Sequence, residues 1–314
     1  MARDPGSKRE ADDAVPAGET GRDAAGAAGG DNPKPLAPGL YLVATPIGAA
    51  DDVTLRALDI LARADVIAAE DTRRARHLMD IHGIALRRRP LIPYHDHNGA
   101  AQRPGLLARI RDGRSVALVS DAGTPLVADP GWRLAREAID AGLAVTAAPG
   151  ASAVLAALSI AGLPTDRFLF AGFPPTKTGE RARFLAEFAA VPATLVFYES
   201  PRRLGESLAA MRDAFGDRPA AVCRELTTRF EEARRGGLAA LAETYADHEP
   251  RGEIVVVVGP PAEAGAAEAD IDAMLAAALK DATVKDAARA VAEALGAPRK
   301  AVYARALALA GKAP

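Results

Sequence analysis

The sequence has little cysteine, few aromatic residues and no large excess of charge of either sign. Of its 314 residues, one is cysteine and 4% are aromatic, and 39 Lys and Arg stand against 41 Asp and Glu. The single cysteine, Cys223, excludes a disulfide framework and any zinc site built on cysteines. The net charge of −2 excludes a globally basic nucleic-acid coat protein but allows a local basic patch.

Long apolar runs are also absent. No uninterrupted apolar stretch approaches the ~20 residues that span a bilayer, and the first residues lack the apolar core of a secretory signal. We therefore expect a cytoplasmic protein with no membrane partner. With 49% hydrophobic residues, a chain of this length has enough apolar side chains to bury a large core.

The usual nucleotide-binding motifs are missing from the sequence. It contains no Gly-x-Gly, no GxxxxGK[ST] phosphate loop and no GxSxG nucleophile elbow. His95 and His97 flank Asp96, but nothing else in the sequence completes a set of metal ligands, so we expect no metal. Any ligand site must therefore be built from other loops.

Four segments of different composition follow one another. Residues 1–38 are rich in Gly, Ala, Pro, Asp and Arg and bury too little surface to offset the entropy of ordering, which predicts a disordered extension. Residues 39–150 and 151–262 each have the pattern of an α/β domain. A linker over 260–269 leads to a small helical unit over 270–312.

In the first α/β segment, short apolar runs alternate with amphipathic stretches. This alternation is typical of βαβ units with a mostly parallel sheet. The predicted strands are 40–44, 66–69, 91–93, 115–120 and 144–148, and the predicted helices lie near 53–64, 73–82, 100–112 and 131–141. The second segment predicts strands at 167–171, 194–198, 220–224 and 253–258, and helices near 179–190, 201–215 and 236–247.

The end of the chain predicts three helices, at 271–280, 285–295 and 299–310. Residues 280–314 carry seven basic and three acidic side chains. A helix–turn–helix with a basic face suits nucleic-acid docking. A helical cap that completes a core or a dimer is equally consistent with this pattern.

Loop-forming residues follow every predicted strand of the first segment. The loops are TPIG (45–48), EDTRRAR (70–76), YHDHN (94–98), SDAGTP (120–125) and PGAS (149–152), and YESP (198–201) follows a strand of the second segment. Ligands of parallel α/β sheets bind at these carboxyl ends of strands, so the loops predict a ligand cleft. Gly123 and Gly150 would let the backbone approach the ligand, and Ser152 would cap a helix starting near Ala153.

Arginines cluster in one stretch of this neutral chain. Between residues 73 and 89 there are six of them against one acidic residue, Asp80. Guanidinium groups match phosphate oxygens, so the cluster predicts contact with a nucleic-acid backbone, although a solvated helix face would have the same composition. Arg202 and Arg203 follow the YESP loop, on the other side of the proposed cleft.

The order of these motifs resembles one family closely. ATPIG, AAEDTRRARHLM, YHDHN, VSDAGTPLVADPG, APGASA, FAGFPP, FYESPRRL, CRELTT and RGEIVVVV are similar to the ribosomal RNA small-subunit methyltransferase I family, over about residues 39–312. The family usually has Asn-Leu after PIG, where this chain has Ala49 and Ala50. If that amide touches RNA or cofactor, its loss would weaken activity.

The resemblance implies a tetrapyrrole-methylase fold: two α/β domains with S-adenosylmethionine in the cleft between them, followed by a helix–turn–helix tail. It also implies a homodimer that methylates a cytidine 2′-hydroxyl in the decoding region of 16S rRNA in the small ribosomal subunit. The residues implied to bind the cofactor are Pro46, Gly48, Asp121, Gly123, Thr124, Val127, Ser152, Ala153, Tyr198 and Glu253.

Proton transfer and RNA binding are then assigned to polar residues at strand ends. Glu70 and Asp71 are the first candidates for a base or orienting group, with Arg73 positioning a phosphate, although Asp71 or Thr72 would equally serve as a helix cap. The candidates for RNA contact are Arg74, Arg76, His95, His97, Arg87, Arg88, Arg89, Arg202 and Arg203. Two alternatives stay open: a methyltransferase for precorrin-type tetrapyrroles, and a ribosome-binding factor without catalysis.

Overall fold

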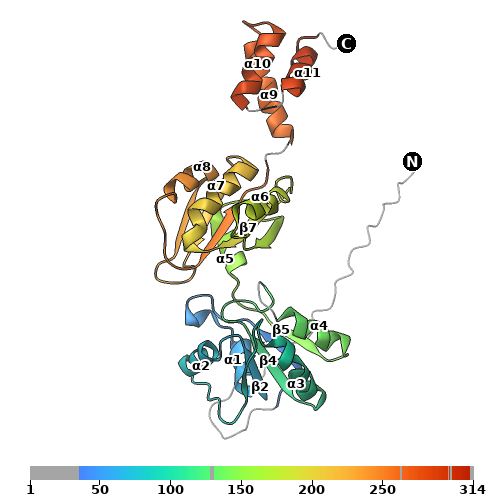
Figure 1. Cartoon of the computed structure of the whole chain (residues 1–314), viewed down its shortest axis with the longest axis vertical. Coiled ribbons are helices and arrows are strands. Elements are labelled where there is room, and N and C mark those ends of the chain that lie inside the picture. The colour runs from blue at the N-terminus through green and yellow to red at the C-terminus, as the bar shows by residue number, and fades with distance from the viewer. Residues whose placement is uncertain (1–34, 128–130, 262–263, 296, 298, 312–314) are drawn as a thin grey trace, which may run out of the picture. The chain divides into compact units, whose positions relative to one another are not determined.

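The computed structural model describes residues 35–127, 131–261, 264–295, 297 and 299–311. These residues form two five-stranded sheets, each flanked by helices, and a helical tail (Figure 1). The predicted disordered extension over residues 1–38 lies outside the described residues except for its last four. No described helix has the length and apolarity that crossing a membrane requires.

The first sheet is entirely parallel. Its strands are β1 (Gly39–Val43), β2 (Val66–Ala69), β3 (Leu91–Pro93), β4 (Ser115–Val119) and β5 (Val145–Ala148), in the order β3-β2-β4-β1-β5. Strands β2 and β4 are buried along their whole length, which accounts for their unbroken apolar sequences. Every strand predicted here is present, with its ends within one residue of the expectation.

Helices cover both faces of the first sheet. They are α1 (Leu55–Arg63), α2 (Thr72–Ile81), α3 (Gly99–Arg111) and α4 (Trp132–Asp140), and a short 3₁₀ helix, η1, spans Ala50–Asp52. Alternate residues of β4 belong to opposite cores: Leu118 packs with residues of α3 and α4, whereas Val119 packs with residues of α1 and α2. The period of two along each strand therefore divides the apolar residues between two layers.

The second sheet is mixed. Its strands are β6 (Phe168–Gly172), β7 (Thr194–Glu199), β8 (Pro219–Arg224), β9 (Glu232–Gly237) and β10 (Ile254–Val258), in the order β6-β7-β10-β8-β9. Only β6 and β7 pair in parallel among its described strands. Strand β9 was not predicted, because its sequence EARRGG has no apolar alternation and its place at the sheet edge requires none.

Four helices flank this second sheet. Helix α5 (Ala153–Ala161) covers one face, and the other face carries α6 (Thr178–Ala186), α7 (Leu204–Phe215) and α8 (Leu238–Thr244), with a 3₁₀ turn, η2 (Pro201–Arg203), before α7. Their buried side chains form two clusters, one on each face.

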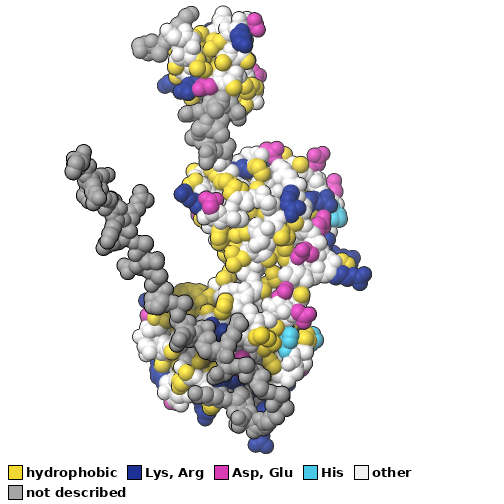
Figure 2. Space-filling view, turned by 180° about the vertical axis from the view of Figure 1, so that it is seen from behind, with side chains coloured by type: hydrophobic (Ala, Val, Ile, Leu, Met, Phe, Trp, Pro, Cys, Tyr) yellow, Lys and Arg dark blue, Asp and Glu magenta, His cyan; other side chains and the backbone are white. Residues whose placement is uncertain are grey.

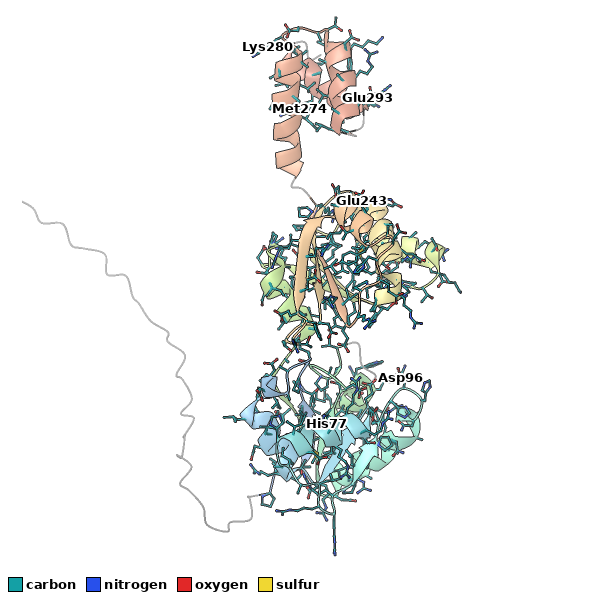
Figure 3. The ribbon with its side chains drawn as sticks, turned by 90° about the vertical axis from the view of Figure 1, so that its left-hand side faces the viewer. His77, Asp96, Glu243, Met274, Lys280 and Glu293 are labelled. Carbon is teal, nitrogen blue, oxygen red and sulfur yellow. The ribbon has the colours of Figure 1, made fainter. Side chains whose placement is uncertain are left out.

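The tail consists of α9 (Ala264–Ala278), α10 (Val284–Leu295) and α11 (Arg299–Leu309), which share a small apolar cluster around Leu275, Val291 and Val302. Met274, Lys280 and Glu293 mark this unit in Figure 3. The prediction of a linker over 260–269 is wrong in its second half, because helix α9 starts at Ala264. The Ala-rich sequence there has high helix propensity. The domain boundaries at 150, 262 and 270 stay predictions.

Candidate functional site

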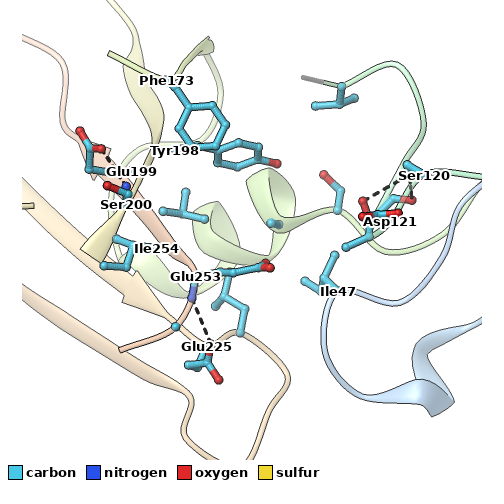
Figure 4. A pocket seen from close by; sticks show the side chains of 18 of the residues that line it. Ile47, Ser120, Asp121, Phe173, Tyr198, Glu199, Ser200, Glu225, Glu253 and Ile254 are labelled. Atoms are coloured by element: carbon cyan, nitrogen blue, oxygen red, sulfur yellow. Dashed lines mark hydrogen bonds between the residues drawn. The ribbon is translucent and has the colours of Figure 1, made fainter. Parts of the chain in front are cut away.

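A cavity of about 650 Å³ lies where strand ends of both sheets meet, and we call it the acidic pocket. From the first sheet it is lined by residues that follow β1, β2, β4 and β5. From the second it is lined by residues that follow β6, β7 and β8 and by the residues that precede β10, because β10 runs opposite to the other three. Residues representing these eight strand ends are Ile47, Glu70, Asp121, Ser152, Phe173, Ser200, Glu225 and Glu253, and all of them except Glu70 and Ser152 are labelled in Figure 4.

The loops on the first-sheet side are tied to one another. The backbones of Thr45 and Gly123 exchange two hydrogen bonds, of 2.9 and 3.0 Å, and the Thr124 hydroxyl donates to the carbonyl of Ala151 at 3.0 Å. Gly123 has a φ of +76°, and a Cβ at this position would lie 3.3 Å from the side chain of Ile47. Three loops are thus held in one arrangement by contacts with one another.

On the second-sheet side, Glu225 and Gly252 are packed against each other. Glu225 adopts a left-handed φ of +50°, and its carboxylate accepts a hydrogen bond from the amide of Glu253 at 3.0 Å. Gly252 also has a positive φ of +90°, and a Cβ there would lie 1.9 Å from a carboxylate oxygen of Glu225. Position 252 therefore accepts glycine alone without a shift of its neighbours.

A second contact joins the β8–β9 loop to the loop after β1. The Thr227 hydroxyl accepts a hydrogen bond from the backbone amide of Ala49 at 3.0 Å, and a Cβ at Gly48 would lie 2.7 Å from this hydroxyl. Thr227 holds a left-handed φ of +63°, which is strained for a β-branched residue. Ala49 thus makes its contact through the main chain and needs no side-chain amide for it.

The charge of the pocket is strongly negative. Among the described residues that line it, five are acidic and Arg74 is basic, with its Nε 3.9 Å from Asp121. One of the five, Glu199, is fully buried and committed to the guanidinium of Arg203 at 2.7 Å, the Ser207 hydroxyl and the Ser200 amide. The remaining acidic residues, Glu70, Asp121, Glu225 and Glu253, give the pocket a potential that attracts a cation.

Aromatic side chains form one wall. Tyr198 packs edge-on against Phe170 and Phe173, with ring centroids 4.7 and 5.4 Å apart, and Phe173 is 55% exposed. In Figure 4 the Tyr198 hydroxyl and the Glu253 carboxylate both point into the pocket. Burial, with a smaller contribution from the charge of Glu253, raises the pKa of Tyr198 above its ordinary value, so the hydroxyl remains a donor.

Most residues implied to bind the cofactor line this pocket: Asp121, Gly123, Thr124, Val127, Ser152, Ala153, Tyr198 and Glu253. Pro46 and Gly48 are not among the described lining residues, although Ile47 between them is. The prediction that the Ser152 hydroxyl caps α5 is wrong, since it makes no capping bond at that position. At Gly150 a Cβ would lie 2.8 Å from the side chain of Ala44, which gives this glycine a packing role in the protein itself.

The three residues predicted for catalysis do not all lie in the pocket. Glu70 lines the pocket, whereas Asp71 and Arg73 are not among the described lining residues. Asp71 caps α2 by accepting from the amide of Arg73 at 2.8 Å, and its carboxylate pairs with the Arg73 guanidinium at 2.7 Å. The side-chain hydrogen bond from Arg73, with that from its backbone amide, lowers the pKa of Asp71 to about 2, which makes Asp71 a poor base.

The residues predicted to contact RNA are not brought to one place. Arg74 lines the pocket, Arg76 is exposed on the same helix, and the Arg202 side chain is 88% exposed. Arg203 is instead held by Glu199 and by the Pro174 carbonyl. His95 and His97 form an edge-on pair in the loop after β3, where Figure 3 marks Asp96. The described residues contain no cluster of three or more His, Cys, Asp or Glu suited to a metal.

The placement of Arg87, Arg88 and Arg89 corrects the sequence interpretation. They lie before β3 and line a different cavity, at the opposite edge of the first sheet. Helix α2 carries the chain from one edge to the other, so arginines close in sequence lie at the two ends of the strands.

Several lining residues were missed, all from the second sheet and its loops: Phe173, Glu225, Leu226, Thr228, Gly252, Ile254 and Val255. A signal for two of them existed, because Phe173 comes directly after β6, and Glu225 directly after β8, as the first-sheet loops follow their strands. The strand-end rule would have found Phe173 and Glu225 had it been applied to every strand of the second sheet.

Comparison with known families and curated proteins gives consistent matches. Residues 39–242 match the family described as Tetrapyrrole (Corrin/Porphyrin) Methylases, and residues 265–310 match the RsmI C-terminal HTH domain. A protein of Mesorhizobium japonicum named ribosomal RNA small subunit methyltransferase I is 55% identical over 279 residues, covering 88% of this chain and 94% of its own. A protein of the same name from Pseudomonas aeruginosa is 43% identical, covering 87% and 98%.

Solved structures with the same fold are more distant in sequence. A cobalt precorrin-4 methyltransferase superposes with a TM-score of 0.53 at 19% identity, covering 70% of this chain and 94% of its own. A diphthine synthase superposes with a TM-score of 0.56 at 16% identity, covering 70% and 89%. Likeness at this level of identity concerns the fold.

Proposed function

The chain belongs to the ribosomal RNA small subunit methyltransferase I family of the tetrapyrrole methylases, and from that premise we propose that it transfers a methyl group from S-adenosylmethionine to the 2′-hydroxyl of a cytidine in the decoding region of 16S rRNA. The names of the relatives support methylation of small-subunit rRNA. The observation that carries the proposal is the acidic pocket, a cavity at strand ends whose charge suits a cationic methyl donor.

The pocket fits S-adenosylmethionine in size and in charge. Its volume of about 650 Å³ lies within the range of roughly 300–1,000 Å³ typical of small-molecule sites. The donor carries a sulfonium and an ammonium group, and the carboxylates of Asp121, Glu225 and Glu253 offer partners for these charges. The aromatic wall of Phe173 and Tyr198 offers an apolar surface for a flat ring.

When bound, S-adenosylmethionine supplies a methyl group that is already electrophilic because it is attached to a sulfonium. The protein must hold the ribose oxygen in line with that methyl and exclude water, which the interlocked loops around Thr45, Gly123 and Thr227 favour. We assign the proton of the 2′-hydroxyl to the carboxylate of Glu70, the predicted catalytic group that lines the pocket. Asp71 and Arg73 hold the start of α2 beside it.

The RNA would approach over the basic residues at the rim of the pocket. Arg74 lines the pocket, and Arg76 on α2 and Arg202 on η2 are exposed on elements next to it. The tail adds basic residues such as Arg299 and Lys300. Contacts to phosphates predict binding that weakens steeply with salt. Action on the small ribosomal subunit would place the protein in the cytoplasm.

We also propose that the chain acts as a homodimer. Helix α4 carries Trp132 and Ile139 seven residues apart on one face, 54% and 59% exposed. Two large apolar side chains at this spacing suit burial against a second copy. Light scattering coupled to size-exclusion chromatography tests this, and a monomer at micromolar concentration would refute it.

The proposed activity is tested with small ribosomal subunits from cells that lack the gene. Purified protein and isotopically labelled S-adenosylmethionine are added, and the rRNA is digested and analysed by mass spectrometry. We expect one new 2′-O-methylated cytidine in the decoding region. Label transferred to a base, or to precorrins in a parallel incubation and not to rRNA, would refute the proposal.

A further inference from the structure

A second cavity, of about 720 Å³, lies at the amino-terminal edge of the first sheet, where the strands begin. We call it the arginine pocket. Its lining includes six arginines, Arg63, Arg87, Arg88, Arg89, Arg109 and Arg114, against one acidic residue, Asp65. Val66, at the start of β2, lines it, whereas Glu70, just after β2, lines the acidic pocket. Four residues of extended strand separate the two cavities by ~13 Å.

Asp65 neutralises only part of this cluster, because its carboxylate is shared between Ser115 and one of the six arginines, Arg114. It accepts from the backbone amide and the hydroxyl of Ser115, at 2.8 and 2.7 Å, and from Arg114 at 3.3 Å. Burial alone would raise its pKa, but the hydrogen bonds from Ser115 and the charge of Arg114 outweigh this effect and hold the pKa below its ordinary value. Arg63 pairs instead with Asp59, at 2.7 Å, so three arginines of the pocket, Arg87, Arg88 and Arg109, have no ion pair or side-chain hydrogen bond among the described residues.

One arginine of the pocket, Arg89, has a structural role, because its guanidinium is bound within the protein. The guanidinium of Arg89 donates to the carbonyls of Leu61 and Ala64, at 2.6 and 3.1 Å, and to those of Ala85 and Leu86. These bonds join the end of α1 to the loop before β3 and satisfy carbonyls that a helix end leaves open. The loop is therefore fixed, and the two residues before Arg89 are held at its surface.

The neighbouring arginines are accessible to an external partner. The side chains of Arg87, Arg88 and Arg109 are exposed, and among the described residues they have neither an ion pair nor a hydrogen bond. Arg87 holds a left-handed φ of +52°, a conformation that costs energy in a residue with a side chain. Figure 2 shows dark blue side chains along the lower margin of the molecule.

We propose that the arginine pocket binds phosphate groups of the substrate RNA backbone, so that the RNA is gripped at both edges of the first sheet. This inference rests on the proposed function. Several exposed and unpaired guanidinium groups around one cavity can contact the oxygens of adjacent phosphates, which a single guanidinium could not. The carboxylates of the acidic pocket repel a polyanion, so the basic residues at its rim need support from a second surface that attracts the RNA backbone.

The test compares two double variants of the full-length protein. Arg88→Glu with Arg109→Glu changes the arginine pocket and leaves the strained position 87 untouched. Arg183→Glu with Arg212→Glu makes the same change in net charge on α6 and α7, which flank the second sheet. Filter binding to transcribed 16S rRNA is measured from 50 to 300 mM salt, with calorimetry for S-adenosylmethionine and thermal unfolding as checks.

We expect the pocket variant to bind 16S rRNA at least tenfold more weakly at about 100 mM salt. Its log–log salt slope should fall by ~1.5–2, as two lost phosphate contacts require, while the control variant changes less than twofold. Its affinity for S-adenosylmethionine and its melting temperature should match those of the unmodified protein. Equal salt slopes for both variants would overturn the inference, as would displacement of the RNA by polyglutamate as effectively as by polyuridylate, which would indicate an acidic protein partner.

The proposed function fails separately from this inference. If the unmodified protein methylates 16S rRNA and the pocket variant behaves like the control, the arginine pocket has no role in RNA binding and the function stands. If the unmodified protein methylates no RNA but the pocket variant still loses affinity and salt slope, the RNA-binding surface stands and the activity is refuted.

Discussion

The two edges of the first sheet carry opposite charge. At the carboxyl ends of the strands, Glu70 and Asp121 line a cavity with one arginine among its described lining residues; at the amino ends, six arginines surround Asp65. The strands between them are apolar and buried, so the sheet separates the charges. A cationic donor and a polyanionic substrate have incompatible electrostatic needs, and this separation meets both within one domain.

The largest effect expected at the carboxyl edge concerns Glu70. Replacing it by Gln keeps its shape and removes the proton acceptor, so the single-turnover rate of methyl transfer should fall by ~10²–10⁴-fold, the usual contribution of a general base. The rate is measured with enzyme in excess over small subunits. Asp71→Ala is the matched control: it should lower the stability slightly through the lost helix cap and leave the rate near its original value. A larger loss of rate in Asp71→Ala than in Glu70→Gln would indicate that Asp71 is the catalytic base.

A second change tests how rigid the acidic pocket is. In Gly252→Ala the new methyl group would clash with the carboxylate of Glu225, and the backbone would be strained at a φ of +90°. We expect the free energy of unfolding to fall by ~3 kcal/mol and the affinity for S-adenosylmethionine to fall at least tenfold. Gly83→Ala, at a φ of +67° with open space around it, isolates the backbone strain. Equal losses in both variants would show that the contact with Glu225 is irrelevant.

The amino edge gives a contrast between two neighbouring arginines. Arg89→Ala removes the side-chain donor from four backbone carbonyls, of which that of Leu86 keeps the amide of residue 89, and should lower the free energy of unfolding by ~1–3 kcal/mol in urea titrations. Arg88→Ala removes an exposed side chain and should change it by less than about 0.5 kcal/mol. If Arg88→Ala were equally destabilising, the assignment of a structural role to Arg89 and a binding role to Arg88 would be wrong.

Backbone strain offers a smaller comparison between the edges. Arg87→Gly relieves a left-handed residue that holds no described polar contact and should raise the free energy of unfolding by about 1 kcal/mol. Thr227→Gly relieves a similar strain but loses the hydrogen bond from Ala49, so its net change should be close to zero. Chemical denaturation of both variants measures the difference. A loss of stability in Arg87→Gly would show that the strain is compensated elsewhere.

The smallest effect is one of pH at the start of α2. Arg73 lowers the pKa of Asp71 to about 2, below the value near 3.9 expected for an unfolded chain. The stabilisation from this pair is therefore complete above about pH 4 and is lost as the pH falls through about 2. Carboxyl-carbon NMR should give a midpoint near 2 for Asp71, rising toward 4 in Arg73→Gln. An ordinary midpoint in the unmodified protein would contradict the pairing.

Much of the fold was predictable because its signals are local. The strands of the first sheet are short apolar runs such as Val66–Ala69, and turn residues end them at once. Loops at the carboxyl ends of parallel strands share one edge by topology, so Glu70, Asp121 and Ser152 could be placed together from the sequence. The sequence was therefore enough to predict that these three residues lie at one cavity.

What the sequence could not supply depends on the path of the chain in space. Six arginines within 17 residues were interpreted as one surface, but α2 and the loop before β3 place them at opposite edges. Whether an arginine faces outward or is held internally is equally hidden: Arg89 and Arg203 read like their neighbours yet are bound within the protein. Strand β9 is specified by its pairing with β8 rather than by its own residues.

The contact between Ala49 and Thr227 has a consequence for how this protein tolerates change. Because the donor is a main-chain amide, any side chain at residue 49 would preserve the bond, and only proline would abolish it. Thr227 has less latitude, since only a side chain with an acceptor keeps the bond, and glycine would lose it in exchange for relief of the backbone strain. Sequence drift is therefore expected to be free on one side of this junction and restricted on the other, even though both residues belong to the same hydrogen bond.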